Sequence, residues 1–288
     1  MGRPRILTFD SGLGGLTVFR EIAKLTPEVD HIYAADDAAF PYGDWAAEDL
    51  VWRVVAVMRR LIADFDPRVV CIACNTASTL VLPHLRTTFP DIPFVGTVPA
   101  IKPAAGRSRS NMISVLATPG TVARDYTRDL VQSFAAHCRV ALVGSKRLAG
   151  IAEDFMRGRN VCDAEIAAEI APCFAEAEGR RTDEIVLACT HYPLLSAHFE
   201  RLAPWPVEWI DPAPAIARRV EHMLREKIFA HVDRRADERV WRIAFTSGAQ
   251  PDAELARVLG DFGLSPAEFA PMPADMPADR ARREAAKT

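Results

Sequence analysis

Two cysteines, Cys74 and Cys189, occupy positions where a thiol could do chemistry. Each follows a short apolar segment, residues 69–73 and 184–188, and each is followed by polar residues. Two thiols on opposite faces of a substrate suit a reaction that removes a proton from one face and returns one to the other. A thiol with an ordinary pKa of about 8.5 is mostly protonated at neutral pH, so each needs a neighbour that tunes it. Asp10, and His191 two residues after Cys189, are candidates for that part.

The other four cysteines are interpreted as packing residues, because a lone cysteine is usually buried and inert. They are Cys71, Cys138, Cys162 and Cys173. Cys71 and Cys74 have the C-x-x-C spacing of redox and zinc sites. On a strand, however, residues three apart face opposite sides, and no second ligand pair completes a zinc site.

The elements that must position these residues alternate along the chain as strand, helix, strand. Apolar runs predict strands over residues 5–9, 31–35, 69–73, 112–116, 139–143 and 184–188. Helical spacing of apolar residues predicts helices ending at Leu25, over 48–65, and over 163–177. This alternation is typical of βαβ units and a parallel sheet.

Ligands bind beyond the carboxyl ends of strands in open parallel sheets. The residues at those ends are rich in hydroxyls, amides, acids and thiols, and poor in lysine and arginine. They are Asp10-Ser11-Gly12, Asp36-Asp37, Cys74-Asn75-Thr76, Thr118-Pro119-Gly120-Thr121 and Cys189-Thr190-His191. The set predicts a pocket for a small polar molecule that is held mainly by neutral donors.

The glycine-rich turn after the first strand allows a rival interpretation. Gly12 and Gly14 have the spacing of a dinucleotide-binding loop, and Asp36 or Asp37 follows at a suitable distance for a ribose contact. Thr17 replaces the third glycine, and Asp10 would repel a pyrophosphate. We therefore expect the backbone N–H groups of this turn to bind a substrate carboxylate instead.

Two pairs of segments repeat in the same order at nearly the same offset. Strand, Ala-Cys and polar residues occur at 69–78 and 185–193, and a strand before a small-residue turn occurs at 6–18 and 113–122. These repeated patterns favour two duplicated halves. A length of 288 residues also agrees with about two domains of roughly 150 residues each.

Composition limits the class of protein. Hydrophobic residues make up 49% and charged residues 25% of the chain, as in a folded protein. A net charge of −3 provides no general attraction for nucleic acid or an anionic membrane. Asp10 comes too early for a signal peptide, and no apolar run is long enough to span a bilayer, so we expect a cytoplasmic protein. Residues 265–288, with four prolines and a charged run, are expected to form a flexible tail without chemistry.

Taken together, these segments closely resemble bacterial glutamate racemase, of the cofactor-independent aspartate/glutamate racemase superfamily. The resemblance rests on FDSGLGGLTV at 9–18, FPYGD at 40–44, ACNTAS at 73–78, ATPGTV at 117–122 and ACTHYP at 188–193, with a weaker match at 245–250. It implies two pseudo-symmetric α/β domains, each a mainly parallel sheet flanked by helices, with the active site in the cleft between them. The first domain would comprise residues 1–98 and 210–264, and the second residues 99–209.

The resemblance also implies roles for individual residues. Cys74 would act on D-glutamate and Cys189 on L-glutamate as the two acid/base groups, without pyridoxal phosphate, other cofactors or a metal. Asp10 would assist Cys74, while His191 and a family glutamate that falls at Glu153 would assist Cys189. The residues implied to hold glutamate are Ser11, Pro41, Tyr42, Gly43, Asn75, Thr76, Thr118, Thr121 and Thr190. The role of Asp37 and a homodimer are left open.

The expected function is therefore interconversion of L- and D-glutamate for peptidoglycan synthesis. A racemase acting on aspartate or another amino acid is an alternative. A non-catalytic sensor of acidic amino acids is a second alternative, although such a sensor would not need two opposed thiols.

Overall fold

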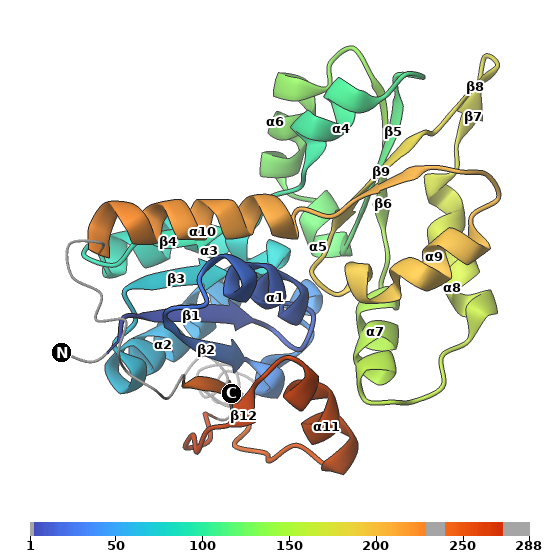
Figure 1. The fold of residues 1–288 in the computed structure, drawn as a ribbon. Coiled ribbons are helices and arrows are strands. Elements are labelled where there is room, and N and C mark those ends of the chain that lie inside the picture. The colour runs from blue at the N-terminus through green and yellow to red at the C-terminus, as the bar shows by residue number, and fades with distance from the viewer. Residues whose placement is uncertain (1–2, 229–239, 273–288) are drawn as a thin grey trace, which may run out of the picture.

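The structure, a computed structural model, describes residues 3–228 and 240–272 of the chain, and its strands form two parallel sheets and a small hairpin (Figure 1). The first sheet has the order β12-β11-β2-β1-β3-β4 and the second the order β10-β9-β5-β6. The strands of the first sheet are β1 (Arg5–Asp10), β2 (Asp30–Ala35), β3 (Val69–Ile72), β4 (Phe94–Gly96), β11 (Trp241–Phe245) and β12 (Ser265–Pro266). Those of the second are β5 (Met112–Ala117), β6 (Arg139–Gly144), β9 (Glu184–Ala188) and β10 (Glu208–Ile210).

The two sheets share one topology. The order β2-β1-β3-β4 in the first half matches β6-β5-β9-β10 in the second, and every pair within both sheets is parallel. The third main strand of each half, β3 or β9, therefore lies beside the central strand and is followed by one of the two cysteines, Cys74 or Cys189. This equivalence agrees with the duplication that the repeated sequence patterns favour.

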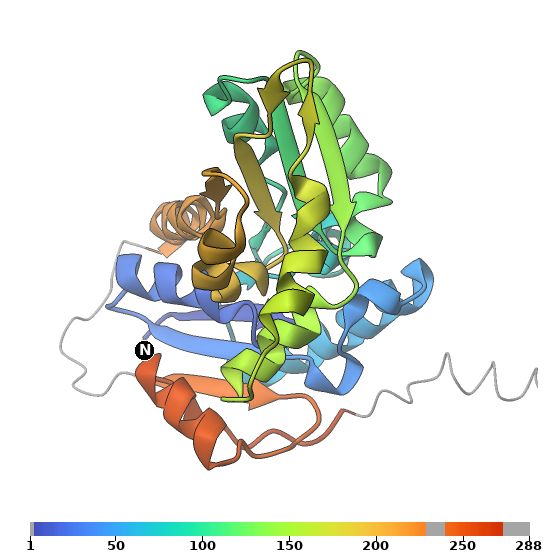
Figure 2. The ribbon, with the colours of Figure 1, turned by 90° about the vertical axis from the view of Figure 1, so that its right-hand side faces the viewer.

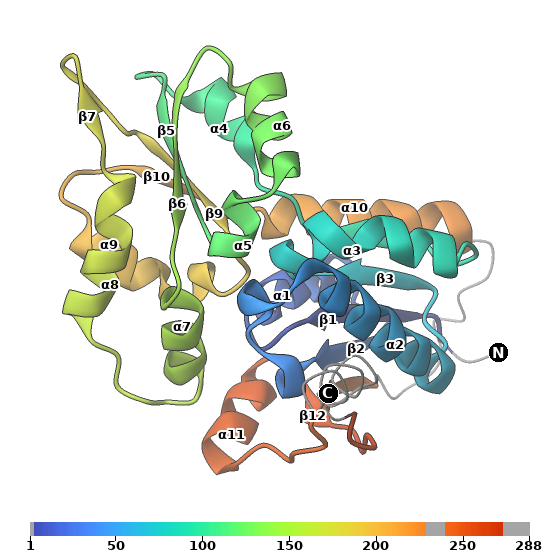
Figure 3. The same cartoon turned by 180° about the vertical axis from the view of Figure 1, so that it is seen from behind.

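Helices cover both faces of the first sheet because its strands carry apolar residues on both sides. Helices α2 (Ala47–Phe65) and α3 (Asn75–Thr88) pack on the face that includes Leu7, and α1 (Leu16–Leu25) and α10 (Ala213–Ile228) on the face that includes Ile6. Figure 3 shows α2 and α3 on the near face, and Figure 1 shows α10 beside the first sheet although it follows β10 of the second.

The second sheet is flanked in the same way (Figure 2). Helices α4 (Ile101–Arg107), α5 (Pro119–Val122) and α6 (Asp125–Phe134) lie toward one face, and α7 (Leu148–Met156), α8 (Asp163–Ile170) and α9 (Ser196–Leu202) toward the other. The remaining helices are α11 (Ala253–Asp261) and the 3-10 turns η1 (Asp37–Ala39), η2 (Tyr42–Asp44), η3 (Ala171–Cys173) and η4 (Tyr192–Leu195). Within the described residues, no helix is both long and apolar enough to cross a membrane.

The six predicted strands are present, each within one residue at either end, and the helix predicted over 48–65 is α2. The helix predicted over 163–177 is wrong, since α8 ends at Ile170 and a hairpin of β7 (Glu176–Ala177) and β8 (Arg180–Arg181) follows η3. Pro172 explains the difference, because proline lacks the N–H that would donate the next α-helical hydrogen bond.

The expected flexible tail also begins too early in the sequence. Ser265 and Pro266 form β12, and Ala267 and Phe269 are buried in the same cluster as α2. The Ala267 N–H donates to the carbonyl of Ile243, which ties this segment to the sheet. Residues 265–272 therefore belong to the fold, and the rest of the expected tail, 273–288, lies outside the described residues.

Candidate active site

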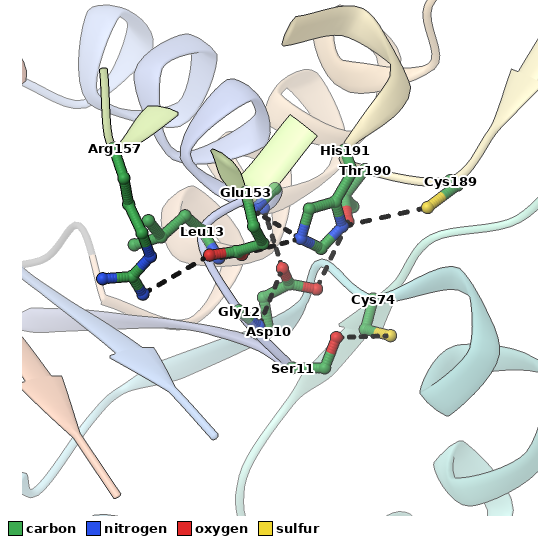
Figure 4. Close-up of polar contacts among 12 residues, drawn as sticks. Asp10, Ser11, Gly12, Leu13, Cys74, Glu153, Arg157, Cys189, Thr190 and His191 are labelled. Atoms are coloured by element: carbon green, nitrogen blue, oxygen red, sulfur yellow. Dashed lines mark hydrogen bonds and ion pairs between the residues drawn. The ribbon is translucent and has the colours of Figure 1, made fainter. Parts of the chain in front are cut away.

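The carboxyl ends of strands from the two sheets meet, and Figure 4 shows the two expected thiols there together with Asp10, Glu153 and His191. Asp10 ends β1, Cys74 lies between β3 and α3, and Cys189 directly follows β9. The Thr190 hydroxyl donates to Oδ1 of Asp10 at 3.3 Å, so the two halves are in direct contact. Both thiols are nearly buried, with 6% of Cys74 and 7% of Cys189 exposed.

Cys189 is the end of a chain of polar contacts. Nδ1 of His191 lies 3.9 Å from Sγ of Cys189, and Nε2 lies 2.9 Å from Oε1 of Glu153 on α7. The same carboxylate oxygen accepts a hydrogen bond from the Leu13 N–H at 2.5 Å. Arg157, one helical turn after Glu153, lies 3.6 Å from its other oxygen. The imidazole is thus fixed between a thiol and a carboxylate.

The charges of Cys189 and Glu153, on either side of His191, affect the protonation of its imidazole. Burial alone would lower the pKa of His191, but its contacts with Cys189 and Glu153 raise that pKa well above 6.5. Burial opposes ionisation of Glu153 as well, but the hydrogen bond with His191 brings the pKa of that carboxyl below its ordinary value. The raised pKa therefore favours the imidazolium form of His191, which lies between the Glu153 carboxylate and the Cys189 thiol. A cysteine beside an imidazolium is a common setting for thiolate chemistry.

Cys74 has different surroundings. Its thiol donates to Oγ of Ser11 at 3.8 Å, and burial followed by the charge of Asp10 raises the pKa of Cys74 far above its ordinary value. Burial also raises the pKa of Asp10, although His191 acts in the opposite direction. Cys74 is therefore a protonated thiol in the resting site. Each thiol also lies within electrostatic range of the other, since a charge on Cys189 further raises the pKa of Cys74.

The glycine-rich turn holds side chains of the protein itself. The N–H groups of Gly12 and Gly15 donate to Oδ2 of Asp10, at 3.4 and 2.9 Å, and Leu13 donates to Glu153. The Gly14 nitrogen lies 3.2 Å from Nε2 of His191. The expectation that these N–H groups bind a substrate carboxylate is therefore wrong.

The glycines of this turn are explained by close approach. A Cβ at Gly12 would collide with Oε1 of Glu153, and a Cβ at Gly14 would collide with the His191 ring. Their spacing thus serves contact with the second half of the molecule, and the resemblance to a dinucleotide loop is accidental.

Polar side chains from both halves form the rest of the site. The hydroxyls of Thr76, Thr118 and Thr121 lie 3.1 to 3.4 Å from one another, which joins α3 to α5. The amide of Asn75 is buried, and neither of its polar atoms has a hydrogen-bond partner among the described residues. A buried amide without partners costs free energy, so this side chain is suited to a bound polar ligand.

The loop that contains Pro41, Tyr42 and Gly43 borders the same region. The Phe40–Pro41 peptide is cis, Pro41 is exposed and Tyr42 is buried. The Tyr42 hydroxyl donates to Oδ2 of Asp36 at 2.5 Å, so the backbone of this loop is the part that can face a ligand. A Cβ at Gly43 would lie 3.6 Å from Cβ of Thr118, which places this backbone against α5.

All six cysteines are free thiols. The four that are not expected to do chemistry lie in different environments. Cys71 packs with α1 and α10 and Cys74 with α2, so the two face opposite sides of the sheet, as expected. Cys173 is buried, but Cys162 is exposed at the start of α8, so the packing interpretation is wrong for Cys162. In residues 3–228 and 240–272, no group of three or more His, Cys, Asp or Glu side chains is arranged to hold a metal ion.

Two arginines that contact acidic residues of this region are not among the residues expected from the sequence. Arg157 contacts Glu153, and its signal is the i,i+4 spacing of opposite charges on one helix. Arg53 pairs with Asp36. Its signal is an arginine on the apolar stripe of α2, three residues after Leu50 and four before Val57.

Comparison with known proteins finds close relatives over most of the chain. The profile of the family described as Asp/Glu/Hydantoin racemase matches residues 12–220. The glutamate racemase of Brucella anthropi is 54% identical over 262 residues, which cover 90% of this chain and 92% of that protein. The glutamate racemase of Agrobacterium fabrum is 55% identical over 260 residues, covering 90% and 93%. The crystal structure of Escherichia coli glutamate racemase with L-glutamate and the activator UDP-MurNAc-ala superimposes with a TM-score of 0.82 at 36% identity, covering 92% of this chain and 97% of that one.

Proposed function

This chain belongs to the Asp/Glu/Hydantoin racemase family, and we propose that it interconverts L- and D-glutamate by proton transfer between Cys74 and Cys189. It is an amino-acid racemase, an isomerase. The observation that carries the proposed mechanism is the placing of two buried thiols at equivalent strand ends of two facing halves, each with its own polar partner. The names of relatives at 54% and 55% identity favour glutamate over aspartate as substrate.

In the L-to-D direction, Cys189 acts as the base. Its thiolate, paired with the imidazolium of His191, takes the α-proton of L-glutamate, while Glu153 holds the imidazolium in place. The electron pair left on the α-carbon spreads into the α-carboxylate, and Cys74 delivers its proton to the opposite face. Cys74 is well suited to be the donor because it is protonated at rest.

In the D-to-L direction, the two thiols exchange tasks. Cys74 must first lose its proton, and Asp10, whose own pKa is raised, is the nearby carboxylate that can assist. The thiol of Cys189 then returns a proton to the other face, with His191 as its partner. The different surroundings of the two thiols therefore match the two directions of one reaction.

Neutral side chains hold the substrate in this proposal. Asn75 supplies the unsatisfied amide, and the hydroxyls of Ser11, Thr76, Thr118, Thr121 and Thr190 border the same space. Donors directed at the α-carboxylate stabilise the negative charge that develops in the transition state. The backbone of Pro41, Tyr42 and Gly43 closes the site from the side of α5.

The wider setting follows from the reaction. D-glutamate serves peptidoglycan synthesis, and two-thiol chemistry needs reduced cysteines, which a cytoplasmic location maintains. We assign the first sheet, residues 1–98 with 210–264, to one domain and residues 99–209 to the other, and we extend the first domain to Met272 because residues 265–272 pack on it. Light scattering of the purified protein tests the homodimer.

The test is racemisation by the purified protein. L-glutamate should be converted until both enantiomers are present in equal amounts, and Cys74→Ala or Cys189→Ala should each reduce the rate at least about a hundredfold. Cys162→Ala, at an exposed position, is the matched control and should keep full activity. Full activity in either active-site variant would remove that thiol from the mechanism. Faster turnover of aspartate would favour the other racemase, and calorimetric binding of glutamate without turnover would favour a sensor.

A further inference from the structure

A fully buried ion pair lies behind the loop that borders the site. Arg53 of α2 donates from Nε to Oδ2 of Asp36 at 3.0 Å and from Nη2 to Oδ1 at 2.6 Å, and both side chains are essentially inaccessible to solvent. Burying two charges is costly, and such a pair is weak evidence for stability by itself. The proton-transfer steps use neither residue, so the pair needs another explanation.

The Asp36 carboxylate is the centre of a larger network. Besides Arg53, it accepts hydrogen bonds from the hydroxyls of Tyr42 and Thr246, each at 2.5 Å. Thr246 directly follows β11, so the network joins the ends of β2 and β11 to the loop. A carboxylate with donors on both oxygens fixes the orientation of every partner.

Tyr42 connects this network to the catalytic thiol. Its ring packs in the same apolar cluster as Cys74 and lies within range of the charge on that sulfur. The turn η2 that begins at Tyr42 contacts both α3, which starts after Cys74, and α5. Tyr42 is thus held at its hydroxyl by Asp36 and packs with its ring in the cluster that contains Cys74.

The segment after β12 completes the network from the outside. Nη2 of Arg53 donates to the carbonyl of Met272 at 2.9 Å, and the Met272 N–H donates to the carbonyl of Thr246 at 2.6 Å. Asp37, whose role the sequence left open, accepts from the N–H of Ser247 at 2.9 Å and from its hydroxyl. The two adjacent acids thus have different main partners: Asp36 holds Tyr42 and Arg53, and Asp37 holds Ser247, while Thr246 contacts both.

We propose that the Asp36–Arg53 pair is a positioning device that places Tyr42 and the backbone of residues 41–43 for glutamate binding beside Cys74. This inference rests on the proposed function, and it assigns Asp36 and Arg53 as positioning residues that act through Tyr42. Because the pair acts on the substrate-binding wall, its loss should weaken binding of glutamate more than it slows proton transfer.

The first test removes the hydrogen bond from Tyr42 to Asp36 and keeps the aromatic ring. Tyr42→Phe should raise the KM for glutamate about tenfold, the loss expected for one hydrogen bond to a charged group, with kcat changed less than about threefold. Ser114→Ala is the matched control, because it also removes a buried hydroxyl, one that donates to the Cys173 carbonyl in the second sheet. The control should leave KM unchanged.

The second test separates positioning from stability. Asp36→Leu combined with Arg53→Met removes both charges together, an exchange that buried pairs often tolerate without loss of stability. The double variant should melt at a higher temperature than Asp36→Leu alone, which leaves the charge of Arg53 buried without its partner, and should still show the raised KM. A folded Tyr42→Phe or a folded double variant with unchanged KM would overturn the inference. If the double variant does not fold, Tyr42→Phe decides. If the unmodified protein does not racemise glutamate, the proposed function fails instead.

Discussion

The two thiols at the centre of the site are chemically unequal, although they occupy equivalent strand ends. Cys189 faces an imidazolium that is held by a carboxylate, whereas Cys74 faces a hydroxyl and lies near the carboxylate of Asp10. The imidazolium beside Cys189 and the carboxylate near Cys74 thus place charges of opposite sign next to the two sulfurs. The proposed mechanism uses this difference, since Cys74, whose pKa is raised by burial and then by the charge of Asp10, is the proton donor in the L-to-D direction.

Substitution of Glu153 tests the polar contacts that run from Glu153 through His191 to Cys189. Glu153→Gln keeps the shape but removes the charge that holds His191 protonated, so kcat with L-glutamate should fall about tenfold to a hundredfold. Steady-state kinetics measure the effect. Glu165→Gln, at an exposed pair with Arg147, is the control and should retain kcat. An unchanged kcat in Glu153→Gln would show that the imidazolium is not held by this carboxylate.

The raised pKa of Cys74 predicts an alkaline pH dependence of its reactivity. The thiolate is the reactive form, so below the pKa the rate of alkylation rises about tenfold with each pH unit. Alkylation of Cys74 by iodoacetamide, followed by peptide mass spectrometry, should rise from pH 6 to 9 without a plateau. Exposed Cys162 in the same sample shows that the reagent is active. A plateau below pH 8 would contradict the assigned surroundings of Cys74.

At the scale of the elements, the turn between β1 and α1 positions groups from both halves. It orients Asp10 through two N–H groups and lets Glu153 and His191 approach its backbone. Parallel-sheet alternation predicts that such a turn lies at the site, together with both thiols and His191. The same reasoning could not derive Glu153 from its own pattern, because it lies on α7, 38 residues before its partner His191.

Gly14→Ala tests this close approach. The added methyl group would displace the His191 ring, so kcat should fall at least about tenfold. Gly150→Ala on α7 is the matched control, since a Cβ there meets no atom within 4 Å. Alanine also has a higher helix propensity than glycine. The control should keep activity and melt at the same or a higher temperature. Full activity in Gly14→Ala would mean that the ring can move without consequence.

The expectation of a tail from residue 265 rests on the composition of the whole stretch 265–288, which has four prolines and a charged run. The fold of residues 265–272 depends on two apolar residues, Ala267 and Phe269, that find partners far away in the sequence. The Phe269 ring stacks on Phe65 at the end of α2 and lies against the guanidinium of Arg60. Local composition carries no information about such partners, and for the same reason it does not predict β11, which pairs with β2 from the start of the chain.

Phe269→Ala measures what this segment contributes. The variant should lose roughly 3 kcal/mol in the free energy of unfolding, as is typical when a buried aromatic ring is removed. Urea unfolding gives the value. Phe134→Ala, at a ring that is 39% exposed on α6, should cost less than about 1 kcal/mol. Equal losses in the two variants would place residues 267–269 outside the core.

At the scale of the whole molecule, two copies of one topology face each other and share one site. The order β2-β1-β3-β4 recurs as β6-β5-β9-β10, so Cys74 and Cys189 follow equivalent strands, β3 and β9, of the two halves. The two halves differ around this common frame, because β11, β12 and α10 are added to the first sheet alone. The repeated sequence patterns predict the common frame, whereas the additions depend on long-range pairing that no local pattern reveals.

Whether two separate groups carry the proton is tested most directly by racemisation of L-glutamate in heavy water, stopped at low conversion. A thiol carries a single proton, so the proton taken by Cys189 can return only to the face it left, while Cys74 supplies a deuteron to the other face. Mass spectrometry of the separated enantiomers should find nearly every D-glutamate molecule with one deuterium at the α-carbon and almost none in the remaining L-glutamate. D-glutamate that largely retains its original α-proton would contradict the two-thiol mechanism.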